Sequence, residues 1–362
     1  MSSLTDRLRA RIRSEGPISF YAFMSLALYD DESGYYSREH QRWGRAGDYR
    51  TSPERSVLFA ATFANYFARL YQKLGAPAAW TLFEVGAGTG EFAEEVLKSL
   101  RLRAPEVFTA TRYLIDERSP ASQTAIRERL APFGQQVELA LIKDLPTIST
   151  GIIFSNELLD AFPVHRMTVR ADQLEEFYVA LNETGKFMWT VAEPSTPGLE
   201  KYFADAGIQL KEGQIAEINP GIRDWIKMVT GKLARGYVVT VDYGAEAAEL
   251  FSVSQHPEGT LRGFKQHRLV DDVLADPGVQ DITSSVNWTE VIQAGDTAGL
   301  KKIVFARQDQ FLLQEGLLDE LERRVSETTD ESEKVRLRVS AREMILPEGM
   351  SASFQVLVQE KG

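Results

Sequence analysis

Three polar side chains that could do chemistry follow one short apolar run. Gly151 to Phe154 form a predicted strand, and the segment SNELLDAFP follows at 155–163. The ends of parallel strands in α/β sheets face the ligand crevice, so Asn156, Glu157 and Asp160 would lie at its entrance. We interpret Glu157 and Asp160 as candidate catalytic carboxylates and Asn156 as a residue that fixes a cofactor or a nucleophile. The alternative is that one of the acids only caps the following helix.

A glycine-rich turn lies upstream of these residues. Gly86, Gly88 and Gly90 alternate between an apolar run at 81–85, broken only by Glu84, and apolar positions at helical spacing over 92–100. This pattern predicts a buried strand, a tight turn and an amphipathic helix, the opening unit of a nucleotide-type α/β fold. Glycine suits such a turn because a cofactor must approach the backbone closely and some φ values are positive.

The side chains around the turn indicate which cofactor it holds. A dinucleotide turn would have a third glycine at position 91, where this chain has Glu91. Glu94 and Glu95 also place negative charge at the start of the helix, where binding of a pyrophosphate requires positive potential. Glu84 adds a carboxylate before the turn. Acid around a glycine turn suits a ligand without phosphates that carries an ammonium and a sulfonium, which describes S-adenosylmethionine. The alternative is that the helix acids only favour the helix dipole and face water.

Further candidate cofactor ligands follow the next two predicted strands. Asp116 and Glu117 end the run at 113–115, where an acid can accept two hydrogen bonds from ribose hydroxyls, and both qualify by position. Asp144 follows the predicted strand at 137–142, where the amino group of an adenine could be reached. The alternative for Asp144 is a loop acid or a helix cap.

Composition excludes several classes of function. The chain has 362 residues and no cysteine, and the lack of cysteine excludes disulfides, thiolate catalysis and cysteine-based zinc sites. Its net charge of −11 gives no sign of nucleic-acid binding. No apolar run approaches the length of about 20 residues that a membrane helix needs. The first sixteen residues carry four arginines, as transit peptides do, but Asp6 and Glu15 argue against that role. We expect a cytoplasmic protein without a metal, and leave a homodimer open.

The order of predicted elements gives the fold class. Residues 1–76 are expected to form a helical N-terminal region with a lid-like loop, and 77–362 an α/β domain with a β-rich insertion at about 164–235. Predicted strands at 236–241, 303–305 and 354–358 join the four named above. The prediction is therefore a Rossmann-like, seven-stranded sheet.

Several segments, in their order along the chain, resemble the MidA family. Members of this family are methyltransferases linked to mitochondrial complex I assembly. The resemblance covers nearly the whole length, in the segments GPISFYAFMSLALYDDESGYYS (16–37), GDYRTSPE (47–54), NELLDAFPVH (156–165), EINP (217–220), VDYG (241–244) and GTLRGFKQH (259–267). It implies a class I methyltransferase fold that uses S-adenosylmethionine. Thr51 and Pro53, in the second segment, join the candidate cofactor-binding residues.

The resemblance also implies a substrate class, an arginine of a protein partner. A second hypothesis is O- or N-methylation of a small molecule, for which His267 could act as base because an unperturbed histidine titrates near neutrality. The alternative for His267 is a structural histidine. A third hypothesis is a non-catalytic assembly factor whose cofactor pocket only stabilises it.

Overall fold

The computed structural model describes residues 3–37, 57–265, 268–346 and 353–362. Contacts within the chain divide it into two compact units, which are described separately. Unit 1 comprises Met1–Tyr49, Leu159–Trp225 and Gly244–Gln293; unit 2 comprises Arg50–Leu158, Ile226–Tyr243 and Ala294–Gly362.

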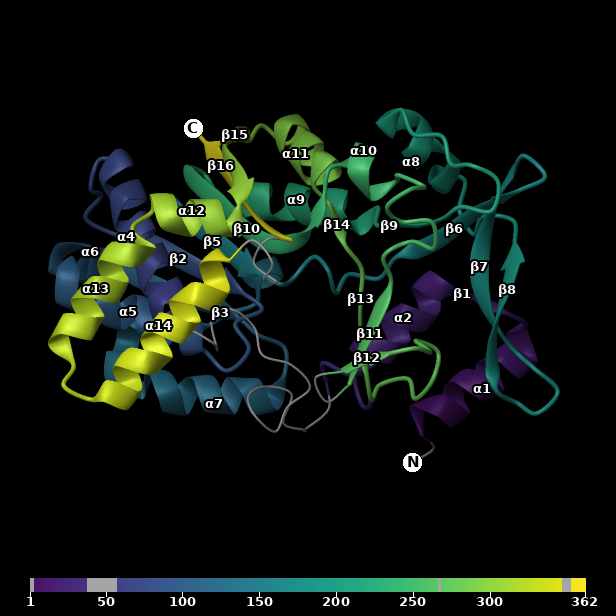
Figure 1. Cartoon of the computed structure of the whole chain (residues 1–362), viewed down its shortest axis with the longest axis horizontal. Coiled ribbons are helices and arrows are strands. Elements are labelled where there is room, and N and C mark those ends of the chain that lie inside the picture. Colours follow the sequence, from purple (N-terminus) through teal and green to yellow (C-terminus); the bar gives the residue numbers. More distant parts are fainter. Residues whose placement is uncertain (1–2, 38–56, 266–267, 347–352) are drawn as a thin grey trace. The chain divides into compact units, whose positions relative to one another are not determined.

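Unit 2 is built on a mostly parallel sheet (Figure 1). Its strand order is β15-β16-β10-β5-β2-β3-β4, in which β16 pairs antiparallel with both β10 and β15 and the other neighbouring strands pair in parallel. The strands are β2 (Trp80–Val85), β3 (Thr111–Asp116), β4 (Val137–Leu139), β5 (Gly151–Asn156), β10 (Gly236–Ala245), β15 (Lys301–Arg307) and β16 (Phe354–Lys361). From β2 the chain runs outward to β3 and β4 and then returns to the other side of β2 with β5, so the order reverses between β2 and β5.

The predicted Rossmann-like α/β sheet is confirmed, but the predicted count of seven strands is not. Seven strands follow one another along the sheet, and β14 (Val286–Asn287) pairs in parallel with Gly244 and Ala245 at the end of β10. In the described residues the sheet therefore has eight strands.

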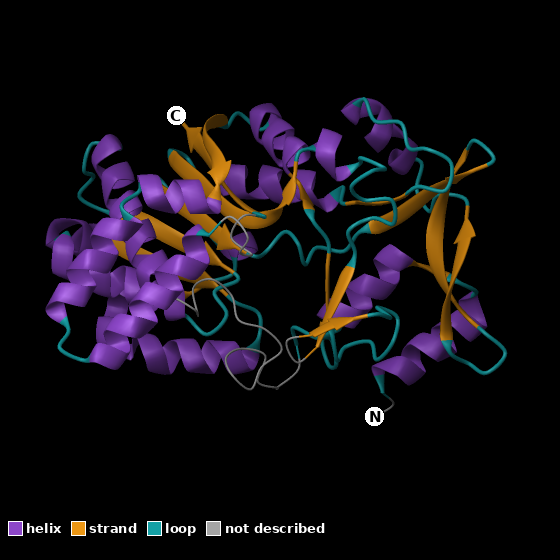
Figure 2. Cartoon of the chain, viewed as in Figure 1, coloured by secondary structure: helices purple, strands orange, loops and turns teal. Residues whose placement is uncertain are grey.

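A layer of helices packs against the sheet of unit 2 (Figure 2). Phe63 of α4 (Val57–Lys73) contacts Phe92 of α5 (Glu91–Arg103) and Phe154 of β5, and the rings of Phe92 and Phe154 stack with centroids 4.4 Å apart. The other helices over this unit are α6 (Pro105–Ala110), α7 (Pro120–Leu130), α12 (Gln308–Gln314), α13 (Leu317–Glu327) and α14 (Glu331–Ile345), with the short 3-10 turns η1 (Ala131–Gln136) and η2 (Ile142–Asp144).

Unit 1 holds two smaller antiparallel sheets. The first has the order β1-β7-β6-β9, with β8 on β7, and the second the order β12-β11-β13. Their strands are β1 (Ile18–Ser19), β6 (His165–Arg170), β7 (Gln173–Leu181), β8 (Phe187–Ala192), β9 (Ile215–Ile218), β11 (Arg262–Lys265), β12 (Arg268–Val270) and β13 (Asp281–Thr283). The helices α1 (Leu4–Glu15), α2 (Phe20–Tyr29), α8 (Gly198–Ala206) and α10 (Ala247–Leu250) belong to this unit, whereas α9 (Gly221–Lys232) and α11 (Trp288–Thr297) continue from unit 1 into unit 2.

The contacts group the chain differently from the expected segments. Among the described residues, α1 and α2 group with the sheets of unit 1, while α4 groups with the parallel sheet because its aromatic side chains pack on α5 and β5. Unit 1 also takes in residues 244–293, beyond the expected insertion. The boundaries near residues 76, 164 and 235 remain predictions.

Across the described ranges, no helix combines the length and the apolar character that crossing a lipid bilayer requires.

Candidate functional site

Three of the predicted site residues leave the sheet side by side, at the point where the strand order reverses. Val85 of β2 lies opposite Asp116 of β3 and Ser155 of β5. The next residues along the three strands are therefore Gly86, Glu117 and Asn156. Ligands of open α/β sheets bind at such a reversal, outside the carboxyl ends of the strands.

The glycine turn has the backbone conformation that its sequence predicts. Gly86, Gly88 and Gly90 have φ angles of +76°, +56° and +80°, a region that L side chains rarely adopt. A Cβ atom at Gly86 would lie 3.2 Å from Cδ1 of Leu158, and one at Gly90 would lie 3.1 Å from Cγ1 of Ile126. The turn therefore brings its backbone close to its surroundings in a way that larger residues would hinder.

The two acids at the end of β3 have different surroundings. Glu117 lies at the turn, where its carboxylate accepts hydrogen bonds from the Gly88 N–H (3.1 Å) and the Ser119 N–H (2.8 Å). Asp116 is buried and accepts the Ile142 N–H at 2.8 Å, and burial raises its pKa despite that bond. Asp116 thus ties β3 to η2, which ends at the exposed Asp144. The charge of Asp144 also raises the pKa of Asp116.

Glu84 is a buried carboxylate beneath the glycine turn. It is 5% exposed, and the Tyr113 hydroxyl donates a hydrogen bond to it at 2.7 Å. The pKa of Glu84 is raised to about 7, because burial and the charge of Glu117 raise it by more than the hydrogen bond from Tyr113 lowers it. A cation bound beside Glu84 would favour its ionised form.

Asn156 and Glu157 form a joined pair at the end of β5. The Asn156 amide donates a 3.1 Å hydrogen bond from Nδ2 to Oε1 of Glu157, while its Oδ1 is buried without a partner among the described residues. Glu157 has a φ of +51°, which for a residue with a side chain costs about 1–3 kcal/mol. Such strain is concentrated at functional sites, and the buried amide oxygen is an acceptor that a ligand could satisfy.

The structure does not unite all the predicted residues. Asp160 is buried, and its carbonyl accepts the Ser284 N–H at 3.0 Å, but it belongs to unit 1 whereas Glu157 belongs to unit 2. Their action as a pair remains a prediction. Thr51, Pro53 and His267 lie outside the described residues.

One residue of the site, Arg129 of α7, was missed by the sequence analysis. It donates at 3.0 Å to the Thr89 carbonyl in the turn and, also at 3.0 Å, to the carboxylates of Glu91 and Glu94. Glu95 pairs with Arg324. The acids at the start of α5 are thus held by arginines rather than simply facing water, and no local pattern signals partners at least 35 residues away.

The gathered groups fit S-adenosylmethionine. Carboxylates suit its ammonium and ribose hydroxyls, the buried Asn156 oxygen can accept a further hydrogen bond, and the glycines leave room at the backbone. Within the described part of the chain, no group of three or more His, Cys, Asp or Glu residues is placed to hold a metal ion.

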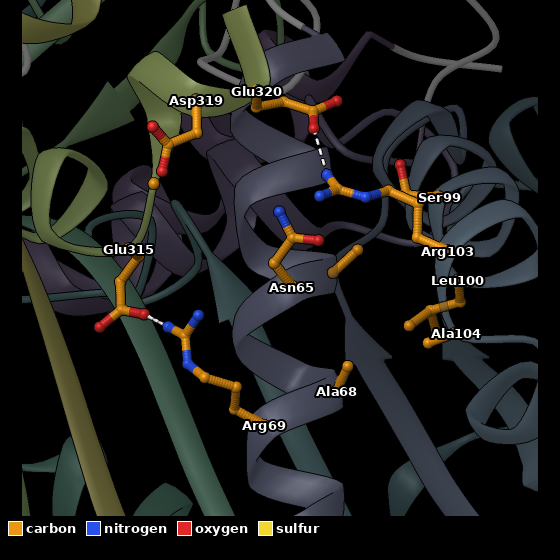
Figure 3. Close-up of a pocket in the computed structure, with 12 residues that line it drawn as sticks. Asn65, Ala68, Arg69, Ser99, Leu100, Arg103, Ala104, Glu315, Asp319 and Glu320 are labelled. Carbon is orange, nitrogen blue, oxygen red and sulfur yellow. Dashed lines mark hydrogen bonds and ion pairs between the residues drawn. The ribbon is translucent and has the colours of Figure 1, made fainter. Parts of the chain in front are cut away.

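A separate hollow of about 350 Å³ lies between α4, α5 and the start of α13 (Figure 3). The ion pairs Arg69–Glu315 and Arg103–Glu320 form its sides. It adjoins the C-terminal half of α5, a 13-residue helix about 20 Å long that begins at the glycine turn. The hollow is therefore distinct from the candidate site.

Comparisons with known proteins agree with this chemistry. The sequence model of a family described as "Putative S-adenosyl-L-methionine-dependent methyltransferase" matches residues 62–306. The mitochondrial protein arginine methyltransferase NDUFAF7 homolog of Drosophila melanogaster is 25% identical over 82% of this chain and 71% of its own length. The human mitochondrial NDUFAF7 is 24% identical over 88% of this chain and 74% of its own length.

A solved structure is also similar over almost the whole chain. The crystal structure of a Burkholderia thailandensis protein bound to S-adenosyl-homocysteine has a TM-score of 0.88 and 29% identity, and the alignment covers 99% of this chain and 92% of that one.

The curated relatives contradict the expected cytoplasmic location, because they are mitochondrial proteins. That expectation is wrong on this finding. It rested on Asp6 and Glu15, and in the structure these acids belong to α1, an amphipathic helix with Leu4, Leu8 and Ile12 buried. Two acids on such a helix are too weak a signal to assign a compartment.

Proposed function

This chain belongs to the family of S-adenosyl-L-methionine-dependent methyltransferases, and from that premise we propose that it methylates an arginine side chain of a protein partner. The observation that carries the proposal is the joined pair of Asn156 and the strained Glu157 at the strand reversal, beside the glycine turn. The curated relatives, which are named as protein arginine methyltransferases, support the same substrate class.

The cofactor supplies a methyl group on a sulfonium, and the chain's part is to bind and orient. In our proposal Gly86, Gly88 and Gly90 let the cofactor lie against the backbone, Glu84 faces its ammonium, and Glu117 accepts hydrogen bonds from its ribose. Asn156 accepts a hydrogen bond through its buried Oδ1 atom. The proposed cofactor-binding residues also include Asp144, near the adenine, and Thr51 and Pro53 of the segment GDYRTSPE.

An arginine as methyl acceptor would explain why carboxylates lie at this site. A guanidinium keeps its proton in water, so an arginine acceptor needs carboxylates that hold its charge on the nitrogens that do not attack. Glu157 is the first candidate for this role, and Asp160 is the second. Methyl transfer to a guanidinium also releases one proton, which Glu157 or Asp160 would accept in our proposal. His267 as a base belongs to the small-molecule alternative, in which a hydroxyl acceptor loses its proton.

The proposal is tested by asking which molecule accepts the methyl group. The purified chain would be incubated with isotopically labelled S-adenosylmethionine and the proteins that co-purify with it, and the labelled residue found by mass spectrometry. Label on arginine supports the proposal; label on a small molecule favours the second hypothesis. Cofactor binding without transfer to any partner favours the assembly factor.

Two variants separate binding from chemistry. Glu157→Gln keeps the size of the side chain but removes its charge, so we expect cofactor binding to persist and transfer to fall. Gly88→Val places a branched side chain at a φ of +56°, so we expect cofactor binding itself to be lost. If Gly88→Val folds, loses the cofactor and still supports the cellular role of the protein, the chain acts as a scaffold. That nucleic acid and membrane are not partners remains a prediction, and a homodimer stays open.

A further inference from the structure

We propose that Asp242 is a positioning residue that holds Glu157 in its left-handed backbone conformation; its effect on methyl transfer rests on the proposed function. Asp242 belongs to the segment VDYG at 241–244, to which the site assigns no role so far. Val241 of β10 lies opposite Asn156 of β5, so Asp242 and Glu157 are the next residues on these two adjacent strands.

The end of β10 holds two consecutive amides of the loop after β5. The Glu157 N–H donates to the Val241 carbonyl at 2.9 Å, and the Leu158 N–H donates to Oδ2 of Asp242 at 3.1 Å. The other carboxylate oxygen of Asp242, Oδ1, accepts the Tyr243 N–H at 2.9 Å. One side chain therefore ties its own strand to the loop that contains Glu157.

The burial of Asp242 makes this link specific. The residue is 0% exposed, and a carboxylate taken out of water needs donors to be tolerated. The amides of Leu158 and Tyr243 are such donors, and the Leu158 amide donates to Asp242 directly after the chain turns at Glu157 with a φ of +51°. A strained conformation persists only where the surroundings hold it.

The backbone at position 157 determines where the functional side chains lie. With that backbone held, Oε1 of Glu157 stays within hydrogen-bonding distance of Nδ2 of Asn156, at 3.1 Å. The carboxylate that we assign to the acceptor then keeps one orientation relative to the strand end. Asp242 acts through Glu157 and not by its own contact with the acceptor.

Unfolding in urea tests the link without any substrate. Glu157→Ala and Glu157→Gly both remove the carboxylate, but only alanine keeps the left-handed strain, so the advantage of glycine over alanine measures that strain. We expect a clear advantage with Asp242 present. In Asp242→Asn, where an NH₂ group replaces one acceptor, the loop relaxes and the advantage should fall by about half or more.

A matched site provides the control. Asp172 has a φ of +59° in the exposed turn between β6 and β7. The advantage of Asp172→Gly over Asp172→Ala should be the same in the presence of Asp242 and in Asp242→Asn, because Asp172 belongs to unit 1 and Asp242 to unit 2. If the advantage at Glu157 is likewise unchanged by Asp242→Asn, the proposal is overturned.

Two further measurements keep the proposal decidable. If Asp242→Asn does not fold, Asp242→Ser replaces it. If that also fails, hydrogen exchange of the Leu158 amide in the unmodified protein decides: protection of about tenfold or more supports the link, and exchange as fast as in an unfolded peptide contradicts it.

Methyl transfer gives the functional test. Asp242→Asn should lower kcat about tenfold while the Kd of S-adenosylmethionine stays within about threefold, and an unchanged kcat would overturn the positioning role. Failure to find an arginine acceptor would instead overturn the proposed function and leave the unfolding result standing.

Discussion

The hydroxyl of Tyr113 on β3 donates a 2.7 Å hydrogen bond to the carboxylate of Glu84 on the neighbouring strand β2, and both side chains are buried. Burial and the charge of Glu84 raise the pKa of Tyr113 well above its usual range, so the phenol stays the donor. Burial also raises the pKa of Glu84 to about 7. A carboxyl beneath the glycine turn therefore changes its charge near neutral pH.

The stability of the protein should reveal this shift. The folded state holds the Glu84 proton more tightly than the unfolded state, so its contribution is fully present below about pH 4.5 and is lost as pH rises through about 7. A rise of the pKa from 4.5 to about 7 corresponds to about 3 kcal/mol of folding stability. Glu84→Gln has no such proton to lose. Between about pH 5 and pH 8 its free energy of unfolding should therefore rise, relative to that of the unmodified protein, by up to about 3 kcal/mol.

Urea unfolding at several pH values provides this measurement. Glu138→Gln is the control, because Glu138 lies on β4 of the same sheet and forms an exposed pair with Arg112. The Glu138 variant should follow the unmodified protein across the same pH range. A Glu84→Gln curve parallel to that of the unmodified protein would show that Glu84 does not titrate in this window.

Binding of the cofactor should depend on the same proton. If Glu84 faces the ammonium of S-adenosylmethionine, binding requires its ionised form, so the Kd should fall as pH rises towards about 7 and then level off. Binding near neutral pH should release a proton. Calorimetry in two buffers with different ionisation enthalpies would measure that proton, and equal heats in both buffers would place the ammonium elsewhere.

Arg129 provides a separate prediction about the turn. It joins the Thr89 carbonyl to Glu91 and Glu94, so Arg129→Met should loosen the turn and weaken cofactor binding about tenfold. Arg127→Met is the matched control, because Arg127 is exposed on the same helix and donates a long 3.4 Å hydrogen bond to Gln123 rather than to the glycine turn. Equal affinities for the two variants would contradict a role for Arg129 in the turn.

The local part of the site could be predicted from the sequence. Alternating glycines between an apolar run and a helical pattern are signals contained in 21 residues, and the structure has β2, the turn and α5 at these positions. Asn156 and Glu157 could be found because they directly follow a run of buried strand residues. The resemblance to known methyltransferases then fixed the class of fold.

Features that depend on distant partners could not be predicted. The bond from Tyr113 to Glu84 depends on the register of two strands, and the contacts of Arg129 cross at least 35 residues. The left-handed backbone of Glu157 has no signal in the residue type, since glutamate rarely adopts it. The packing of α4 on the sheet likewise depends on aromatic side chains far apart in the chain.

Close approach of the cofactor to the backbone can be tested by adding one methyl group. Gly86→Ala and Gly75→Ala both place alanine at a positive φ, +76° and +87°, so each should lose about 1–2 kcal/mol of stability. A Cβ atom at Gly75 meets nothing within 4 Å, whereas one at Gly86 enters the turn 3.2 Å from Leu158. Only Gly86→Ala should weaken cofactor binding, by about tenfold or more in calorimetry. Unchanged affinity in a folded Gly86→Ala protein would mean that the cofactor does not lie against this part of the backbone.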